Sequence, residues 1–295
     1  MSQLRKVAFI GLGQMGLPMA RQLVSATFEV VGVDVSGEAR AALRHCGGQA
    51  IESVAAAMDG AECVVTMLPN GKIVQEALLA SDAFKAAPKG ALLLEMSSSG
   101  PMQTRELSAR IGKHMRVVDA PVSGGVKRAI DGTLTIMAGG EDSDIDAAMS
   151  VLSAMSSKVF RCGPVGAGHA MKAINNYVSG AGVVAASEGV QLGMAFGLNG
   201  DTIVDVLNAS SGKNNATEVK MKQFILSGTF ASGFALGLMA KDIRTAADLS
   251  AGLGLNQTGV RQVAELWGEA SKVLGDGVDH TRLYEYLDRL NGDHA

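Results

Sequence analysis

Short apolar runs alternate with amphipathic stretches along the first half of the chain. Seven runs have the length and β-branched content of buried strands, and they lie at 6–10, 29–34, 62–68, 91–96, 116–122, 133–140 and 158–162. Helical periodicity fills most of the gaps, at 14–25, 37–46, 72–80, 101–113 and 142–155. This alternation predicts a doubly wound α/β sheet.

The pattern changes after "CGPVGAG" (162–168), because strand-like runs disappear. Helical segments follow at about 166–196, 201–209, 216–226, 235–252, 257–274 and 281–290. We therefore predict two domains, an α/β domain over 1–164 and an all-helical domain over 165–295. Polar residues interrupt the apolar stretch 178–198, which favours an interior helix over a membrane span.

Composition suits a folded protein of this size. The chain has 295 residues, of which 47% are hydrophobic and 19% charged, and its net charge of −3 predicts no nucleic acid or membrane partner. Cys46, Cys63 and Cys162 form no disulfide or metal-ligand pattern, so we expect a cytoplasmic protein whose thiols are small core residues. Because only a short segment precedes "VAFIGLG", we expect no cleavable signal.

The first candidate site is "GLGQMG", which follows the first predicted strand and opens a helix. In that context glycines allow a pyrophosphate to approach the helix N-terminus. We assign cofactor contacts to the whole loop, Gly11, Leu12, Gly13, Gln14, Met15 and Gly16. The alternative is an ordinary structural turn.

Asp34 ends the second predicted strand. A carboxylate there can accept hydrogen bonds from the adenosine ribose and would repel a 2′-phosphate, and no arginine follows it immediately. The sequence therefore favours NAD over NADP as the cofactor. The alternative role for Asp34 is a helix cap.

Two further strand ends would line the same crevice, since carboxyl ends of parallel strands meet at one edge of a sheet. Met67, Leu68 and Pro69 follow one strand, and they could flank the cofactor. Ser97 and Ser98 follow the next strand and could face the nicotinamide ribose.

"DAPVSGG" (119–125) ends another strand with Ser123, Gly124 and Gly125. Successive backbone N–H groups and one hydroxyl can surround a carboxylate. From the spacing alone, an ordinary loop is an equal alternative.

Lys172 stands among apolar neighbours in "GHAMKAINNY" (168–177), a run typical of a buried helix. If 166–196 is one helix, then Lys172, Asn176, Ser179 and Val183 share one face. A surface lysine is one interpretation. A general acid/base is the other, and it requires a pKa lowered from about 10.4. The glycine loop and the possible anion cradle upstream favour catalysis.

Together these segments resemble the β-hydroxyacid dehydrogenase family. The resemblance rests on "FIGLGQMGLPMA" (9–20), "DAPVSGG" (119–125), "GAGHAMKAINN" (166–176) and "MAKD" (239–242). It implies a Rossmann-type N-terminal domain and an all-α C-terminal domain joined by a long helix. It also implies a homodimer or homotetramer, built largely through the helical half.

The resemblance also implies roles for particular residues. Lys172 resembles the catalytic lysine and Asn176 the asparagine that holds the substrate, while Ser123, Gly124 and Gly125 resemble the carboxylate cradle. Lys241 resembles the lysine on the cofactor side, with Asp242 as its neighbour. Phe234 would add an apolar wall.

Three positions differ from the family pattern. Ser98 stands where many members have threonine, and His169 stands where glutamine is frequent; we expect His169 on the helix surface. Asn215 replaces a tryptophan that 3-hydroxyisobutyrate enzymes often carry, which leaves the identity of the acid open. An intact Ser-Gly-Gly segment favours a carboxylate over a sulfonate.

These observations predict an NAD-dependent oxidoreductase that transfers hydride between nicotinamide and a short 3-hydroxy acid. An enzyme alternative is a reductase of a small semialdehyde acid of the tartronate, succinic or sulfolactaldehyde type. A non-enzyme alternative is an NAD-binding interaction module, which would be expected to lack Lys172. We expect no metal, because no ligand cluster is evident.

Overall fold

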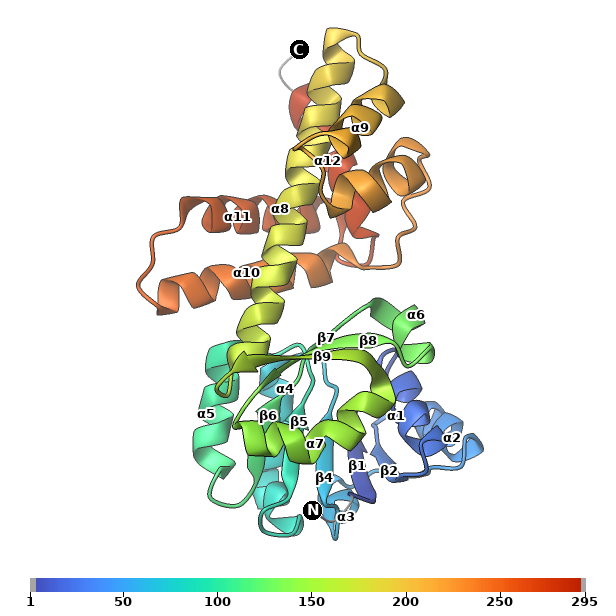
Figure 1. Ribbon diagram of the computed structural model, residues 1–295, viewed down its shortest axis with the longest axis vertical. Coiled ribbons are helices and arrows are strands. Elements are labelled where there is room, and N and C mark those ends of the chain that lie inside the picture. Colours follow the sequence, from blue (N-terminus) through green and yellow to red (C-terminus); the bar gives the residue numbers. More distant parts are fainter. Residues whose placement is uncertain (1–3, 293–295) are drawn as a thin grey trace. The chain divides into compact units, whose positions relative to one another are not determined.

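The computed structural model describes residues 4–292, which form two compact units. The first unit ends at Lys172 and the second begins at Ala173, so helix α8 (Ala167–Phe196) contributes to both. Figure 1 shows the elements of each unit.

One nine-stranded sheet forms the centre of the first unit. Its strands are β1 (Lys6–Ile10), β2 (Glu29–Val33), β3 (Gln49–Ile51), β4 (Cys63–Thr66), β5 (Leu92–Glu95), β6 (Arg116–Asp119), β7 (Val122–Ser123), β8 (Leu134–Gly139) and β9 (Ser156–Gly163). Their spatial order is β3-β2-β1-β4-β5-β6-β8-β7, with β9 paired to β8. Strands β1 to β6 pair in parallel, which confirms the predicted doubly wound α/β fold.

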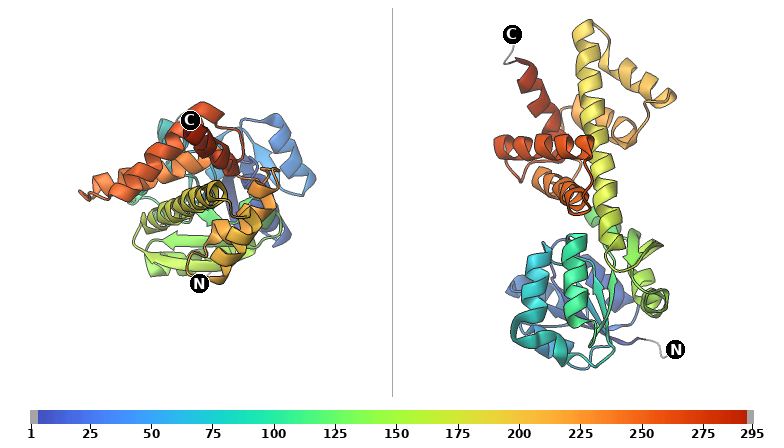
Figure 2. Two further views of the ribbon diagram at one scale, coloured as in Figure 1. Left: turned by 90° about the horizontal axis from the view of Figure 1, so that it is seen from above. Right: turned by 90° about the vertical axis from the view of Figure 1, so that its left-hand side faces the viewer.

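Helices cover both faces of this sheet (Figures 1 and 2). They are α1 (Gly16–Ser25), α2 (Gly37–His45), α3 (Val54–Met58), α4 (Gly71–Leu79), η1 (Ala80–Ala86), α5 (Pro101–Ile111), α6 (Gly125–Ile130) and α7 (Asp142–Met155). Alternate strand residues enter two separate cores. Val7 and Phe9 pack in the core that includes α1 and α7, whereas Ala8 and Ile10 pack in the core that includes α4 and α5.

The edge of the sheet beyond β6 differs from the prediction. The run 116–122 is not one strand: it is divided into β6 and β7, and both pair antiparallel with β8. Pro121 lies at the break, where a residue without an N–H cannot continue a ladder. The sequence also failed to predict β3, α3 and α6, which are too short to show periodicity.

The second unit is helical, as predicted. Besides α8 it contains α9 (Gly200–Ala209), η2 (Ala216–Leu226), α10 (Leu236–Gly252), α11 (Thr258–Leu274), η3 (His280–Arg282) and α12 (Leu283–Gly292). Its core gathers around the fully buried Trp267, and η2 is a π-helix rather than an α-helix. Over residues 4–292, no helix is both long and apolar enough to cross a bilayer.

Candidate active site

The glycine loop follows β1 and turns sharply into α1. Gly11 has φ +99°, and a Cβ there would lie 2.3 Å from the Met67 carbonyl oxygen. A Cβ on Gly16 would lie 1.9 Å from the Gly11 carbonyl oxygen. A Cβ on Gly13, in contrast, would meet nothing within 4 Å. Two glycines therefore allow close packing, and the third leaves open space at the start of α1, which fits a dinucleotide phosphate.

Asp34 fixes this loop from the end of β2. Its carboxylate accepts hydrogen bonds from the Leu12 N–H at 2.7 Å and from the Ser36 N–H at 2.8 Å. The Arg40 guanidinium donates to the Asp34 carbonyl oxygen at 2.6 Å and forms an ion pair with Glu52. The sequence did not reveal Arg40, because the first turn of α2 brings it back to the strand end. Because Arg40 is paired with Glu52, its positive charge is partly neutralised and attracts a 2′-phosphate less.

The ends of β4 and β5 are tied to each other beside the glycine loop. The Met67 N–H donates to Ile10 O at 2.8 Å, and the Leu68 N–H donates to Ser97 Oγ at 3.0 Å. Ser97 is thereby buried and used in the fold, whereas Pro69 is exposed. Met67 and Leu68 are half-buried, and Ser98 is exposed. These strand ends adjoin the glycine loop, while Ser97 itself points to the backbone of Leu68.

The Ser123–Gly125 segment lies where β7 passes into α6. Gly124 and Gly125 have φ values of +133° and +69°, and both are exposed. A Cβ on Gly124 would lie 2.5 Å from Arg128 Cδ, so the stem of that side chain packs on the loop. Positive φ at two successive residues requires glycine and turns the backbone into a tight loop.

Lys172 and Asn176 lie one turn apart on α8. Lys172 is half-buried and Asn176 is 6% exposed. The expected burial of the apolar neighbours is wrong in part, since Met171 and Ile174 are 39% and 45% exposed. The helix is therefore amphipathic here, with Asn176 on its buried side.

Asn176 meets the "MAKD" segment within the second unit. Its Nδ2 donates to Asp242 Oδ2 at 2.6 Å, and its Oδ1 accepts from Asn175 Nδ2 at 3.0 Å. Lys241 Nζ lies 3.9 Å from the Asp242 carboxylate. Burial lowers the pKa of Lys241, although Asp242 opposes the change. Lys241 also lines a hollow of about 470 Å³ between α10 and α11, together with Arg244.

Phe234 is half-buried just before α10, beside a histidine that the sequence did not single out. Its ring stands edge-on to His280, with centroids 5.8 Å apart. The His280 Nδ1 lies 3.2 Å from the Phe234 carbonyl oxygen, while the His280 Nε2 is buried and has no hydrogen-bond partner among residues 4–292. Burial and the charge of Lys220 lower the pKa of His280 to about 4. The ring is therefore neutral at pH 7.

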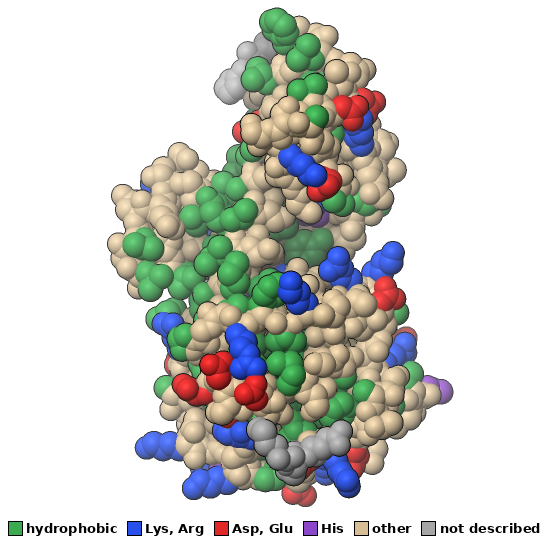
Figure 3. Space-filling view, in the orientation of Figure 1, with side chains coloured by type: hydrophobic (Ala, Val, Ile, Leu, Met, Phe, Trp, Pro, Cys, Tyr) green, Lys and Arg blue, Asp and Glu red, His purple; other side chains and the backbone are tan. Residues whose placement is uncertain are grey.

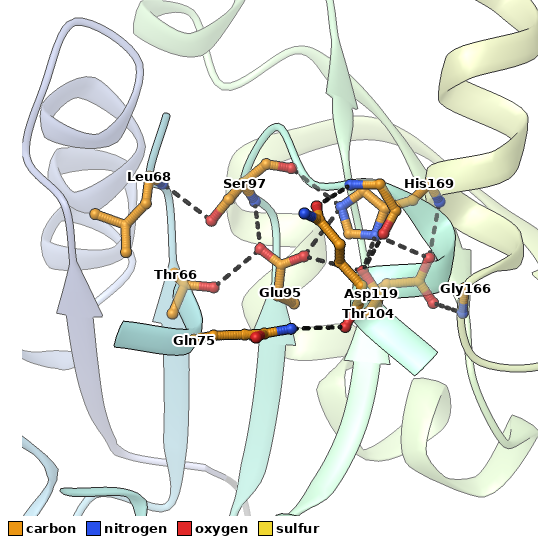
Figure 4. A network of polar contacts seen from close by, with 11 residues as sticks. Thr66, Leu68, Gln75, Glu95, Ser97, Thr104, Asp119, Gly166 and His169 are labelled. Atoms are coloured by element: carbon orange, nitrogen blue, oxygen red, sulfur yellow. Dashed lines mark hydrogen bonds and ion pairs between the residues drawn. The ribbon is translucent and has the colours of Figure 1, made fainter. Parts of the chain in front are cut away.

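His169 is not on the helix surface, contrary to the expectation; it is 2% exposed and lies in a buried polar cluster (Figure 4). Its Nε2 lies 3.1 Å from Glu95 Oε2 and its Nδ1 lies 3.3 Å from Asp119 Oδ2. Thr104 Oγ1 is 3.0 Å from the same Nδ1. Both carboxylates come from strand ends far away in the sequence, so no local pattern could reveal this cluster.

The cluster holds the first turn of α8 to the sheet. The Asp119 carboxylate accepts from the Gly166 N–H at 2.6 Å and from the His169 N–H at 2.8 Å. Burial lowers the pKa of His169, but the charges of Glu95 and Asp119 raise it by more, and its net change is upward. Because each ring nitrogen faces a carboxylate, a doubly protonated ring fits this geometry. Lys172 follows His169 by one helical turn, so its backbone is fixed from the sheet.

The three cysteine thiols differ in burial. Cys63 is buried, whereas Cys46 and Cys162 are only half-buried, so the expectation of core thiols holds for Cys63 alone. Within the part of the chain that the structure describes, no three His, Cys, Asp or Glu side chains gather as a metal site.

Two family models match consecutive parts of the chain. The NAD binding domain of 6-phosphogluconate dehydrogenase matches residues 6–163. The NAD-binding domain of NADP-dependent 3-hydroxyisobutyrate dehydrogenase matches residues 166–287.

Individual proteins are similar over most of their length. The chain is 37% identical over 240 residues to 2-(hydroxymethyl)glutarate dehydrogenase of Eubacterium barkeri, covering 81% of this chain and 80% of that protein. It is 36% identical over 249 residues to NAD-dependent L-serine dehydrogenase of Pseudomonas aeruginosa, covering 81% and 83%. The solved structure of Mycobacterium tuberculosis 3-hydroxyisobutyrate dehydrogenase with L-serine matches with a TM-score of 0.90 and 31% identity, covering 97% of this chain and 99% of that one.

Proposed function

The chain belongs to the β-hydroxyacid dehydrogenase family, and we propose that it oxidises a short 3-hydroxy acid with Lys172 as the general acid/base. It is an NAD-dependent hydroxyacid dehydrogenase with a small carboxylate substrate. The observation that carries the proposed roles is the order on α8: Lys172 precedes by one turn an asparagine that Asp242 holds in a single orientation.

The cofactor half of the proposal rests on the first unit. The glycine loop from Gly11 to Gly16 would bind the pyrophosphate, with Gly13 leaving the room for it. Asp34 keeps acceptor capacity for a ribose hydroxyl beyond its two backbone bonds. Met67, Leu68, Pro69 and Ser98 would flank the nicotinamide side, as would Lys241 from the second unit. NAD, when bound, accepts the hydride.

The substrate half of the proposal assigns three tasks. The Ser123 hydroxyl and the N–H groups of Gly124 and Gly125 would bind the carboxylate. The Asn176 amide would hold the hydroxyl group, and Phe234 would exclude water from the carbon chain. Holding the substrate at both ends favours hydride transfer because the reacting carbon is kept at a fixed distance from the acceptor.

Lys172 would move the proton. During oxidation the C–H bond of the carbinol carbon breaks with its electron pair, and the neutral Lys172 amine takes the hydroxyl proton. The product is the corresponding semialdehyde acid. In the reverse direction the Lys172 ammonium returns the proton to the carbonyl oxygen, so the same residues serve a semialdehyde reductase.

We also propose that the protein forms homodimers or homotetramers in the cytoplasm. Large hydrophobic side chains are exposed on the second unit (Figure 3). Leu192, Phe196, Leu198 and Val206, from α8, α9 and the segment between them, are 74%, 85%, 55% and 58% exposed. Apolar surface of this kind favours association with a second copy. Three free thiols support a reducing compartment.

The test is Lys172→Ala beside Lys89→Ala, an exposed lysine before β5. Both proteins should bind NADH equally, as followed by cofactor fluorescence. With a panel of 3-hydroxy acids (3-hydroxyisobutyrate, glycerate, threonate, 4-hydroxybutyrate as a length control, L-serine), Lys172→Ala should lose about 10²- to 10⁴-fold in kcat. Wild-type kcat in Lys172→Ala would refute the role of this residue. Absence of NAD reduction with every acid would refute the substrate class.

A further inference from the structure

A second buried lysine lies in the helical unit, on η2. Lys220 is 9% exposed, and its Nζ donates to Ser179 Oγ at 3.4 Å, its one hydrogen bond within residues 4–292. Burial lowers the pKa of Lys220. Lysine is seldom buried to this extent unless it is paired, so the position requires an explanation.

No carboxylate among residues 4–292 forms an ion pair with Lys220, and Asp279 is the single acid whose charge acts on it appreciably. The Asp279 carboxylate is already used by the fold. It accepts from Ser232 Oγ at 2.9 Å, from the Gly233 N–H at 2.8 Å and from the Thr281 N–H at 3.0 Å. The ammonium group therefore lies buried beside a single hydroxyl, an arrangement that costs stability.

Ser179, the partner of Lys220, belongs to the face of α8 that carries the proposed catalytic residues. It follows Asn176 by three residues and Lys172 by seven, which are helical neighbours on one side. The Lys220 amine is thus directed at the same face of α8, two turns beyond Lys172.

His280 and Phe234 connect Lys220 to the proposed substrate wall. The charge of Lys220 contributes to lowering the pKa of His280, and the His280 ring stands edge-on to Phe234. Lys220 thus acts on the imidazole by its charge, and the imidazole is in ring contact with Phe234, all within the helical unit. These groups offer a cation whose neighbouring acid, Asp279, is already hydrogen-bonded within the fold, which leaves the cation suited to an added anionic group.

We propose that Lys220 binds a second carboxylate of the substrate, so that the preferred substrates are 3-hydroxy acids bearing a distal carboxylate. This inference rests on the proposed function, in which Ser123–Gly125 take the first carboxylate and Lys172 the hydroxyl. Lys220 is then a specificity residue, and its buried charge is compensated when the substrate is bound.

The kinetic test compares diacids with neutral analogues of the same shape. 2-(Hydroxymethyl)succinate and 2-(hydroxymethyl)glutarate are assayed against their distal monoamides, in wild type, Lys220→Met and Lys222→Met. Lys222 is the matched control, because it lies on the same helix, is exposed and pairs with Asp205. Lys220→Met should lose about 10- to 100-fold in kcat/KM for the preferred diacid and little for its monoamide. Lys222→Met should behave as wild type.

A stability measurement separates binding from a structural role. If Lys220 serves a ligand, its replacement by Met removes a desolvation cost and raises the melting temperature of the helical unit. A structural lysine would give a lower melting temperature, and that result would overturn the inference. Equal losses of kcat/KM for diacid and monoamide, or no loss for either, would overturn it too.

A binding experiment decides the case even if no acid is turned over. Trp267, the single tryptophan, stacks on His280, so its fluorescence should follow the protonation of that ring. Glutarate bound to Lys220 should shift this titration to higher pH in wild type and Lys222→Met, but not in Lys220→Met. Butyrate is the monoanion control. No shift with glutarate in wild type contradicts the site, whereas a shift without any turnover supports the site and contradicts the proposed reaction.

Discussion

The Asn176 amide donates a 2.6 Å hydrogen bond to the Asp242 carboxylate, which joins α8 to α10. This bond uses one of the two amide hydrogens and, with Asn175 on the oxygen, fixes which way the Asn176 amide points. The segments 166–176 and 239–242, which resemble two family motifs, are therefore joined directly in the structure. We therefore expect Asp242 to act by orienting Asn176 rather than by contacting the substrate.

We expect Asp242→Ala to misorient Asn176. Loss of a charged hydrogen bond should lower kcat/KM for the 3-hydroxy acid by about 10- to 100-fold. Steady-state kinetics with saturating NAD measure this effect, and NADH fluorescence reports whether cofactor binding is retained. Asp248→Ala, an exposed carboxylate on the same helix, is the control. Equal kinetics for the two variants would show that the hydrogen bond does not matter for the reaction.

Gly13 and Gly16 provide a matched pair in the glycine loop. Gly16→Ala places a Cβ 1.9 Å from a backbone oxygen, so it should destabilise the first unit by roughly 1–3 kcal/mol. Gly13→Ala has space for its Cβ and should fold normally, but the methyl group occupies the room that a phosphate needs. NAD binding should weaken by about 10- to 100-fold.

Urea unfolding and NADH titration on both variants separate these effects. A Gly13→Ala protein that binds NADH as wild type does would mean that the phosphate lies elsewhere. A Gly16→Ala protein of unchanged stability would mean that the loop relaxes around the new methyl group.

The sequence predicted well those helices and strands whose own residue pattern is sufficient to identify them. Buried parallel strands such as β1 and β4 are short, nearly continuous apolar runs, and such runs are visible without a neighbour. Long helices such as α8 and α10 likewise show their amphipathic period. Short elements that lack a continuous apolar run, such as β3 and α6, do not, because they depend on the surrounding structure.

The polar groups were harder to predict, because their environment is built from distant segments. His169 has the local pattern of a surface residue, and only the fold brings Glu95 and Asp119 to it. Lys220 stands between Val219 and Met221, which was an available signal. The π-helical turns of η2, however, alter the spacing by which its buried face could be identified.

The helical unit should lose stability in mild acid because of His280. Its pKa is lowered to about 4 in the folded protein, by burial first and by the charge of Lys220 second. Between about pH 6.5 and 4 the unfolded chain binds a proton that the folded unit does not, so stability falls by roughly 3 kcal/mol as the pH decreases.

Urea unfolding followed by the emission of Trp267 measures this effect, because the single tryptophan lies in that unit. His280→Gln is the comparison, since glutamine does not titrate. The variant should show a weaker dependence over this range. If wild type and variant lose the same stability between pH 6.5 and 4, other groups cause the acid effect.

The first unit should respond in the opposite direction through His169. Its folded pKa is raised by Glu95 and Asp119 above the ordinary value of about 6.5. A raised histidine pKa contributes stability that is fully present below about pH 6.5 and is lost as the pH rises through the folded value. His169→Gln keeps a hydrogen-bonding side chain without the charge, so its stability should not follow this titration.

Cys63 provides the measurement, because it is fully buried in β4 and its thiol reacts only when the sheet opens. In a background with Cys46 and Cys162 replaced by serine, labelling of Cys63 in urea gives the opening free energy at each pH. The ratio of wild-type to His169→Gln labelling rates cancels the titration of the thiol itself. That ratio should rise as the pH increases above 6.5, because only wild type loses the imidazolium. A ratio independent of pH would show that His169 is neutral throughout, and the buried cluster would then act through hydrogen bonds alone.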